Sequence, residues 1–188
     1  MLAGGGSVRF GRDKLAEQYH GAPLLHHAVL RLAEVCDDVV VVLAPGSDTT
    51  GLPPAVRAAF DPTSGEGPLA GLQAGLLSVA AADLVIVSAG DMPDLRVPVL
   101  LEMLRVAGEA DVDAVALAEG DRFRPLPCVV HPAAAADAAH SLLHAGSRRL
   151  RDVLTALRTA IIDEATWTAL DPDRRTLFDI DEPGDLLR

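Results

Sequence analysis

The chain has 188 residues, 49% of them hydrophobic, which is long enough and apolar enough for one domain with a sizeable core. Its formal net charge of −11 and its 3% aromatic residues oppose a nucleic-acid-binding surface, because such a surface needs cations for phosphates and rings for bases. Two isolated cysteines, Cys36 and Cys128, exclude a disulfide framework or a zinc site and favour a reducing cytoplasm.

No apolar run reaches the length of a membrane span, and the first residues carry no signal-peptide pattern. We therefore expect a single domain over residues 1–188, located in the cytoplasm, with neither a nucleic acid nor a membrane as partner.

The chain begins with a glycine-rich stretch, LAGGGSVRFGRDK (residues 2–14). Glycines let a ligand approach backbone N–H groups closely, and the cations between them favour an anion, so the stretch predicts a phosphate-binding loop. It is not a Walker loop, because two residues separate Gly11 from Lys14, nor a dinucleotide fingerprint, because Arg9 stands where a glycine is needed. A flexible terminal tail is the alternative.

A loop of this kind follows a strand, yet only Met1 and Leu2 precede Ala3. The first strand is therefore expected to be truncated, either because the start is shortened or misassigned or because the strand is a stub. In each case its neighbours in the sheet would lack some hydrogen-bond partners.

Helical and strand patterns alternate along the rest of the chain. Apolar spacing and β-branched runs predict helices over residues 23–36, 68–81, 97–106, 133–144 and 148–157. They predict strands over residues 39–43, 84–88, 114–117, 127–130, 160–162 and 177–180, an exposed loop over 46–54 and a terminal helical turn. This order predicts an α/β fold: a three-layer αβα, Rossmann-like arrangement with a mostly parallel sheet and the ligand site at the carboxyl ends of the strands.

Asp91, in SAGDMPDL, directly follows the predicted strand 84–88. A carboxylate at the carboxyl end of a strand can hold Mg²⁺, which prefers one or two carboxylates together with phosphates and water. An aspartate that only forms a turn is the alternative.

The stretch over residues 2–14 resembles the nucleotide-binding signature of the molybdenum cofactor guanylyltransferases of the MobA type. GPLAG (residues 67–71), GDMP (90–93) and FDIDEPGDL (178–186) fall in that family's order and spacing, so the resemblance covers essentially the whole chain. It implies a fold of the nucleotide-diphospho-sugar transferase type. It also implies transfer of GMP from GTP to the phosphate of molybdopterin, with pyrophosphate as the second product.

The resemblance also implies roles for individual residues. Arg9, Lys14 and Asp91 would be catalytic, with Arg9 and Lys14 holding phosphates and Asp91 binding Mg²⁺. The nucleotide would contact Leu2, Ala3, Gly4, Gly5, Lys14, Asp61, Gly67, Pro68, Leu69, Gly71 and Asp91. Leu43 stands where the family often has an asparagine, and its side chain cannot make that hydrogen bond, so this nucleotide contact is either lost or made by the backbone. The implied partners are GTP and molybdopterin, together with molybdenum-insertion proteins and acceptor molybdoenzymes or their chaperones.

The residues predicted to bind the acceptor come from two segments. Arg148 and Arg149 lie near the start of a predicted helix, where an anion is favoured, and the resemblance puts them on the pterin side. Asp179 and Asp181 alternate on the predicted strand 177–180 and the residue after it, and could contact the pterin or a second metal. A solvated charged surface is the alternative for both segments.

Other side chains are assigned no chemistry. Cys128 is expected to be an inert core residue, and His26 and His27 to serve packing or the surface. His140 and His144 share a helical face, but two imidazoles alone make a weak metal site.

Three other functions stay open. A sister enzyme would use CTP, but Gly4-Gly5 and GPLAG oppose it on the family pattern. A sugar-phosphate guanylyltransferase shares the first signature but is usually longer. A non-catalytic nucleotide-binding or cofactor-delivery protein is the alternative from another class, although a protein without activity would have no chemical reason to keep Arg9, Lys14 and Asp91 together.

Overall fold

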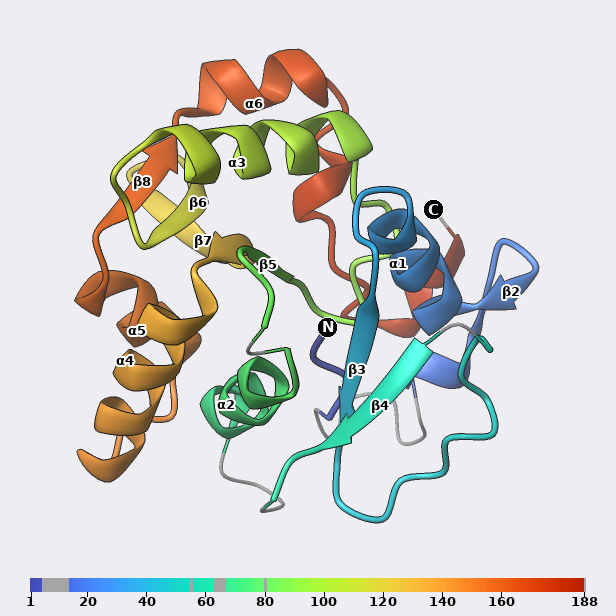
Figure 1. Cartoon of the computed structure of the whole chain (residues 1–188). Helices are drawn as coiled ribbons and strands as arrows, with labels where there is room; N and C mark the ends of the chain where they lie inside the picture. The colour runs from blue at the N-terminus through green and yellow to red at the C-terminus, as the bar shows by residue number, and fades with distance from the viewer. Residues whose placement is uncertain (5–13, 55, 63–66, 80, 188) are drawn as a thin grey trace.

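The computed structural model describes residues 1–4, 14–54, 56–62, 67–79 and 81–187 (Figure 1). The strands are β1 (Gln18–Tyr19), β2 (Ala22–Pro23), β3 (Val39–Leu43), β4 (Val56–Phe60), β5 (Val85–Val87), β6 (Ala114–Glu119), β7 (Arg122–Val130) and β8 (Thr159–Ile162). The α-helices are α1 (Leu24–Ala33), α2 (Pro68–Ser78), α3 (Val97–Glu109), α4 (Pro132–His144), α5 (Leu150–Ala156) and α6 (Glu164–Leu170). Short 3₁₀ helices are η1 (Lys14–Ala16), η2 (Arg175–Leu177) and η3 (Pro183–Leu187).

The first three residues join two groups of strands into one sheet. β3 pairs with β4 in parallel, and the other group has the order β5-β7-β6-β8. Leu2 forms parallel bridges to both Val42 and Ala89, and its N–H donates to the Ser88 carbonyl at 2.8 Å. The segment before Gly4 is thus the central strand, and its described part is as short as the sequence predicts.

The sheet is mostly parallel. β7 runs antiparallel to both β5 and β6, whereas β3 with β4 and β6 with β8 are parallel pairs. This arrangement confirms the predicted α/β fold with a mostly parallel sheet.

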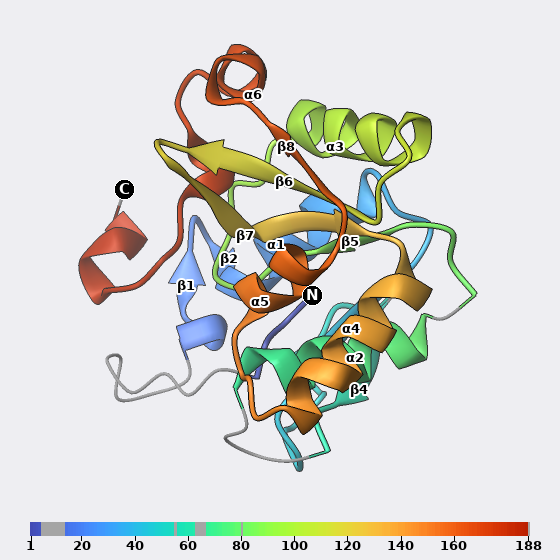
Figure 2. The ribbon, with the colours of Figure 1, turned by 90° about the vertical axis from the view of Figure 1, so that its left-hand side faces the viewer.

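Helices cover both faces of the sheet, so the fold has the three αβα layers that the sequence predicts (Figures 1 and 2). Residues of α1, α3 and α6 share one apolar cluster with Val41, Ile86 and Val129. Residues of α2, α4 and α5 share another with Val87 and Cys128. All five residues of β3 are buried, as a strand covered on both faces should be.

Most predicted elements are confirmed with shifted ends. α1 begins at Leu24 because Pro23 is its N-cap, α3 continues to Glu109, and β7 begins already at Arg122. α5 begins at Leu150, so Arg148 lies before the helix and Arg149 is its N-cap. The loop over residues 46–54 is largely exposed, as expected.

Several elements were not predicted from the sequence, and one predicted strand does not form. The sequence analysis missed β4, whose residues are mostly exposed or half-buried, because an edge strand of Val-Arg-Ala-Ala-Phe has no buried apolar run and depends on pairing with β3. It also missed α6, which Asp163 caps by accepting the Thr166 N–H and which Trp167 anchors in the core. The strand predicted over residues 177–180 does not form, since η2 ends at Leu177 and irregular backbone follows.

In the described part of the chain, every helix is too short or too polar to cross a membrane.

Candidate active site

The carboxyl ends of the central strands lie together and carry the predicted motifs. The Gly90 N–H donates to the Leu2 carbonyl at 2.9 Å, which brings the loop after β5 beside the central strand. The Asp61 N–H donates to the Leu43 carbonyl at 2.9 Å and so places Asp61 at the same edge. This is the edge at which open α/β sheets bind ligands.

The backbone of Leu2, Ala3 and Gly4 leads from the central strand into this edge. The Ala3 N–H donates to the Val42 carbonyl at 2.8 Å. A Cβ on Gly4 would lie 3.3 Å from the Ala44 nitrogen, so a side chain there would press against the chain leaving β3. Gly5 and Arg9, both predicted to bind the nucleotide, lie outside the described residues.

Lys14 and Asp91 meet at the centre of the candidate site. The Lys14 Nζ donates to Asp91 Oδ2 at 2.7 Å and to the Ile180 carbonyl at 2.8 Å, and it lies 3.7 Å from Asp181 Oδ1. The Lys14 and Asp91 side chains are 15% and 24% exposed, so water screens their attraction only in part. One cation therefore connects the first motif, the loop after β5 and the C-terminal motif.

The contact between Lys14 and Asp91 bears on the alternative that Asp91 only forms a turn. A turn-forming aspartate bonds its own backbone one or two residues on. The Asp91 carboxylate instead accepts from Lys14, 77 positions earlier in the chain. The Asp91 side chain is therefore held by a contact from outside its own loop.

The C-terminal motif is bonded to the loop that carries Asp91. The Ile180 N–H donates to the Asp91 carbonyl at 2.9 Å. Asp179 and Asp181 are therefore near Asp91 and Lys14, but on irregular backbone rather than on the predicted strand.

Arg124 is a residue of this site that the sequence analysis missed. Its Nη2 donates to Asp179 Oδ2 at 2.6 Å, while Asp179 Oδ1 is buried without a hydrogen-bond partner in the described structure. Burial raises the pKa of Asp179; the Arg124 guanidinium opposes that rise and the nearby Asp91 adds to it. The sequence does carry a signal for Arg124: it is a charged residue at the start of the otherwise apolar run RPLPCVV (residues 124–130).

A second hydrogen-bond network, formed by Tyr19, Asp94 and Arg175, also holds the loop after β5. The Tyr19 hydroxyl donates to Asp94 Oδ2 at 2.9 Å, and Arg175 bonds both Asp94 and the Tyr19 oxygen, the latter at 3.0 Å. Tyr19 is 1% exposed, and burial together with Asp94 raises its pKa, so it stays a donor. The loop after β5 is thus held at Asp94 by Arg175 of η2 and at Asp91 by the C-terminal motif.

The GPLAG segment forms the start of α2 beside Asp61. Gly67 is the N-cap with φ +85°, and Pro68 occupies the first turn. A Cβ on Gly71 would lie 3.8 Å from Asp61 Oδ2, so these two predicted nucleotide-binding residues are neighbours. Leu69 is fully buried in the core, which leaves only its backbone for a ligand.

The predicted acceptor residues fall into two groups. A Cβ on Gly67 would lie 3.1 Å from both the Cβ and the carbonyl oxygen of Arg148, so the Arg148 segment adjoins GPLAG. Arg148 and Arg149 are exposed. Asp181 instead adjoins Lys14, and Asp179 lies near Asp91 and Arg124.

The carboxylates suit Mg²⁺ that arrives with a nucleotide. Among the described residues, no group of three or more His, Cys, Asp or Glu side chains could hold a metal on its own. Magnesium in phosphate-transfer sites usually takes one or two carboxylates and completes its shell with substrate phosphates and water. Asp91 and the unpartnered oxygen of Asp179 offer such a donor set.

The remaining candidates stay without a chemical role. Burial raises the pKa of Cys128 to about 12, which keeps it a thiol. His26 and His27 bond the Gly51 and Tyr19 carbonyls, and His140 lies 3.3 Å from Gln73 Nε2. Leu43 is buried in β3, so its side chain cannot replace the asparagine of the family pattern.

Comparison with family models gives a match over residues 1–161 to the family described as MobA-like NTP transferase domain. A relative from Chloroflexus aggregans, named probable molybdenum cofactor guanylyltransferase, is 33% identical over 99% of this chain and 89% of its own. A protein of the same name from Mycobacterium tuberculosis is 34% identical over 89% of this chain and 85% of its own. The molybdenum cofactor guanylyltransferase of Desulfosudis oleivorans is 30% identical over 99% and 90%.

Solved structures share the fold. Molybdopterin-guanine dinucleotide biosynthesis protein A from Archaeoglobus fulgidus superposes with a TM-score of 0.81 and 23% identity over 100% of this chain and 93% of its own. The 2-C-methyl-D-erythritol 4-phosphate cytidylyltransferase of Thermus thermophilus gives a TM-score of 0.68 and 18% identity over 99% and 93%.

Proposed function

Since the chain belongs to the MobA-like NTP transferase family, we propose that it transfers GMP from GTP to the terminal phosphate of molybdopterin and releases pyrophosphate. The observation that carries the proposal is the identity of 30–34% with relatives named molybdenum cofactor guanylyltransferase, over most of both chains. The likeness to a cytidylyltransferase is 18% in sequence and concerns the fold alone, so it supports no use of CTP.

The reaction joins two anions, and the candidate site suits that task. A phosphate of the acceptor would attack the α-phosphorus of GTP, the bond to the β-phosphate would break, and pyrophosphate would leave. The site must offset the repulsion between the reactants and align them in line, which needs fixed cations rather than a covalent nucleophile. Lys14 provides such a cation beside Asp91, and Arg9 is proposed to provide a second.

Mg²⁺, when bound, would neutralise charge on the phosphate oxygens. Asp91 is proposed to hold it, and its contact to Lys14 would fix the carboxylate within the site. The Asp61 carboxylate and the start of α2 from Gly67 to Gly71 are proposed to bind the guanosine part, with the backbone of Leu2, Ala3, Gly4 and Gly5 along the phosphates.

The acceptor is proposed to lie between the two groups of acceptor residues. Arg148 and Arg149 would attract its phosphate, and Asp179 and Asp181 would contact its pterin. Molybdenum-insertion proteins and acceptor molybdoenzymes or their chaperones are the proposed protein partners.

The test combines the purified chain with Mg²⁺, molybdopterin and each of the four nucleoside triphosphates in turn, and measures pyrophosphate. Release with GTP alone supports the proposal. Release with CTP alone would identify a cytidylyltransferase, and no release from folded protein would favour a cofactor-delivery protein.

A further inference from the structure

The first part of β7 pairs with β6 in a shifted register, and this shift places Arg124. Ala116 of β6 lies opposite Cys128, but the next residue, Leu117, lies opposite Arg124. Residues 125–127 therefore have no partner in β6 and form a bulge. Two of them are prolines, which have no N–H to donate to a neighbouring strand. Bulges bend a strand and redirect its side chains, and they are common next to active sites.

Arg124 lies at the edge of the sheet that carries the candidate active site. β5 and β6 both run antiparallel to β7, so they are parallel to each other and their carboxyl ends share one edge. Asp91 follows β5 at this edge, and Leu117, the partner of Arg124, lies near the carboxyl end of β6. A guanidinium on β7 therefore lies at the same edge as Asp91.

The Arg124 guanidinium bonds only one of the two carboxylate oxygens of Asp179. Its Nη2 donates to Asp179 Oδ2 at 2.6 Å, and its Nη1 lies 3.7 Å from Glu119 Oε2. Asp179 Oδ1 is buried and has no hydrogen-bond partner in the described structure. A buried oxygen without a partner costs free energy, and an ion that binds there removes that cost. Arg124 thus fixes Asp179 through one oxygen while the other stays available to a ligand.

The neighbours of Asp179 include the other acidic residues of the site. Burial raises the pKa of Asp179, and the carboxylates of Asp91 and Asp181 add to the rise, while the Arg124 guanidinium opposes it. Asp179 and Asp91 are therefore close enough for their charges to repel each other. Lys14 bonds Asp91 and Arg124 bonds Asp179, so each of these two carboxylates has its own cation.

We propose that Arg124 is a positioning residue: it holds the Asp179 carboxylate through Oδ2, so that Oδ1 can share one Mg²⁺ with Asp91 and the phosphates of the nucleotide. Residues that bond a metal ligand from outside orient it for the metal. Without the guanidinium, the repulsion from Asp91 and Asp181 would be unopposed and the carboxylate would lose its fixed orientation. The inference rests on the proposed function for the Mg²⁺ alone.

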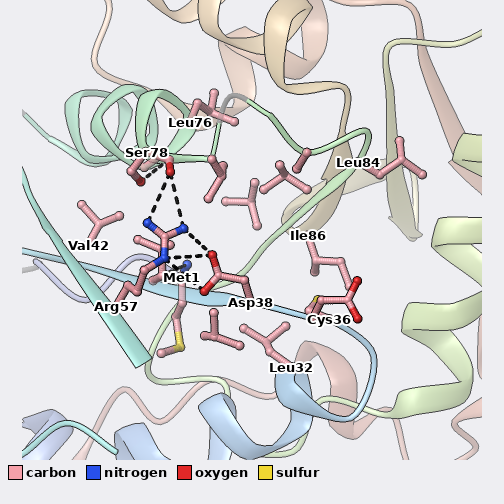
Figure 3. A pocket seen from close by; sticks show the side chains of 18 of the residues that line it. Met1, Leu32, Cys36, Asp38, Val42, Arg57, Leu76, Ser78, Leu84 and Ile86 are labelled. Atoms are coloured by element: carbon pink, nitrogen blue, oxygen red, sulfur yellow. Dashed lines mark hydrogen bonds and ion pairs between the residues drawn. The ribbon is translucent and has the colours of Figure 1, made fainter. Parts of the chain in front are cut away.

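Arg57 offers a matched control, because it forms the same kind of pair at the opposite edge of the sheet. Its Nε donates to the two carboxylate oxygens of Asp38 at 3.2 and 2.9 Å. Both residues line a cavity of about 490 Å³ between the starts of β3 and β5 (Figure 3). Arg57→Leu therefore removes an Arg–Asp pair that lies away from the candidate active site.

The test measures the dissociation constant of GTP by calorimetry without molybdopterin, once with Mg²⁺ and once with a chelator in its place. The ratio of the two constants is the contribution of Mg²⁺ to binding. Arg124→Leu should reduce this ratio at least about tenfold, because loss of a residue that orients a metal ligand typically weakens metal binding about 10- to 100-fold. Arg124→Lys should reduce it less, since an ammonium keeps a donor for Asp179, and Arg57→Leu should leave it unchanged.

The Asp179→Asn variant shows whether the effect of Arg124 passes through Asp179. In that background Arg124→Leu should reduce the ratio no further. An equally large reduction there would contradict the proposal. Arg124→Met, with an unbranched apolar side chain, is measured as well, so that the result does not depend on whether one variant folds.

Three other results would overturn the proposal. If Arg124 attracts the nucleotide directly, Arg124→Leu would weaken GTP binding equally with and without Mg²⁺. If it only stabilises the fold, the midpoint of thermal unfolding would fall and the ratio would stay the same. A ratio near one for the unaltered chain would exclude the shared metal. Failure of the proposed function would look different: the ratio would behave as expected, but no pyrophosphate would be released when molybdopterin is added.

Discussion

Lys14 Nζ lies 2.7 Å from Asp91 Oδ2, although the two residues are 77 positions apart in the chain. The contact joins the first motif to the loop after β5, and the same nitrogen bonds the Ile180 carbonyl of the C-terminal motif. Three segments that are distant in sequence thus converge on one partly buried cation and one carboxylate. The chemistry that we propose depends on this convergence.

Asp91→Asn should lower the rate of pyrophosphate release at least about a hundredfold, or about 3 kcal/mol in the barrier, because an amide is a much weaker ligand for Mg²⁺. The fold should stay intact, as judged by far-UV circular dichroism and thermal unfolding. Asp173→Asn, at an exposed aspartate after α6, is the matched control and should keep full activity. An active Asp91→Asn variant would return this residue to a turn-forming role.

Arg124→Leu should move the acid limb of the pH–rate profile to higher pH. Burial already raises the pKa of Asp179 and Arg124 opposes that rise, so without the guanidinium the carboxylate is protonated at a higher pH. Activity that needs the ionised form is then lost earlier as the pH falls. Arg124→Lys should restore part of the original profile, whereas a merely structural role would lower the rate equally at every pH.

Gly67→Ala should destabilise the protein and weaken acceptor binding. The residue has φ +85°, and its new Cβ would lie 3.1 Å from the Cβ and carbonyl oxygen of Arg148. Gly146→Ala is a matched control, because Gly146 has the same φ and its Cβ would meet nothing within 4 Å. Both should cost about 1 kcal/mol of unfolding free energy from backbone strain. Only Gly67→Ala should also raise the KM for molybdopterin, and equal KM values would contradict the placement of Arg148.

The buried amino group of Met1 should make stability depend on pH. Its pKa is lowered to about 6 in the folded state from 8.0, so between those values the unfolded state binds more protons. The free energy of unfolding should therefore fall as the pH drops from 8 to 6, by up to about 2–3 kcal/mol.

The ionisable groups near Met1, Cys36 and Asp38, do not make the free energy of unfolding vary with pH between 6 and 8. Burial raises the pKa of Cys36, which stays a thiol, and the bond from Arg57 lowers the pKa of Asp38, which stays ionised. A form acetylated at the Met1 nitrogen isolates the effect from the histidines. If urea titrations of both forms show the same slope against pH, the buried amine is not its cause.

The sequence predicted the parts of the fold whose signal is local. β3 is a continuous β-branched run and α1 has regular apolar spacing, so both could be read without tertiary context. β4 could not, because Val56 to Phe60 gain their strand conformation from hydrogen bonds to β3 and lie at the edge of the sheet. The apolar Leu177 to Ile180 segment was misassigned because Ile180 is buried by packing against Tyr19 and Leu24, not by a strand pair.

For the candidate site, the motifs selected the candidate residues but could not predict the contacts between them. Lys14 and Asp91 were selected one by one, and the bond between them depends on the folded sheet. Arg124 was not predicted because it was selected through its bond to Asp179, 55 positions away, and no local sequence pattern indicates that pair. Asp163 and Thr166 carry a capping signal for α6, but the helix was missed because its seven residues are too few to show a regular apolar spacing.

The most direct test of the account follows the guanylyl group itself. GTP labelled at the α-phosphate is incubated with Mg²⁺, molybdopterin and the chain, and the label is followed from the nucleotide to the pterin product. The account predicts that the label appears in a molybdopterin guanine dinucleotide, one GMP for each pyrophosphate released, and that labelled CTP gives no such product. Label that remains in GTP while the protein is folded and binds the nucleotide would contradict it.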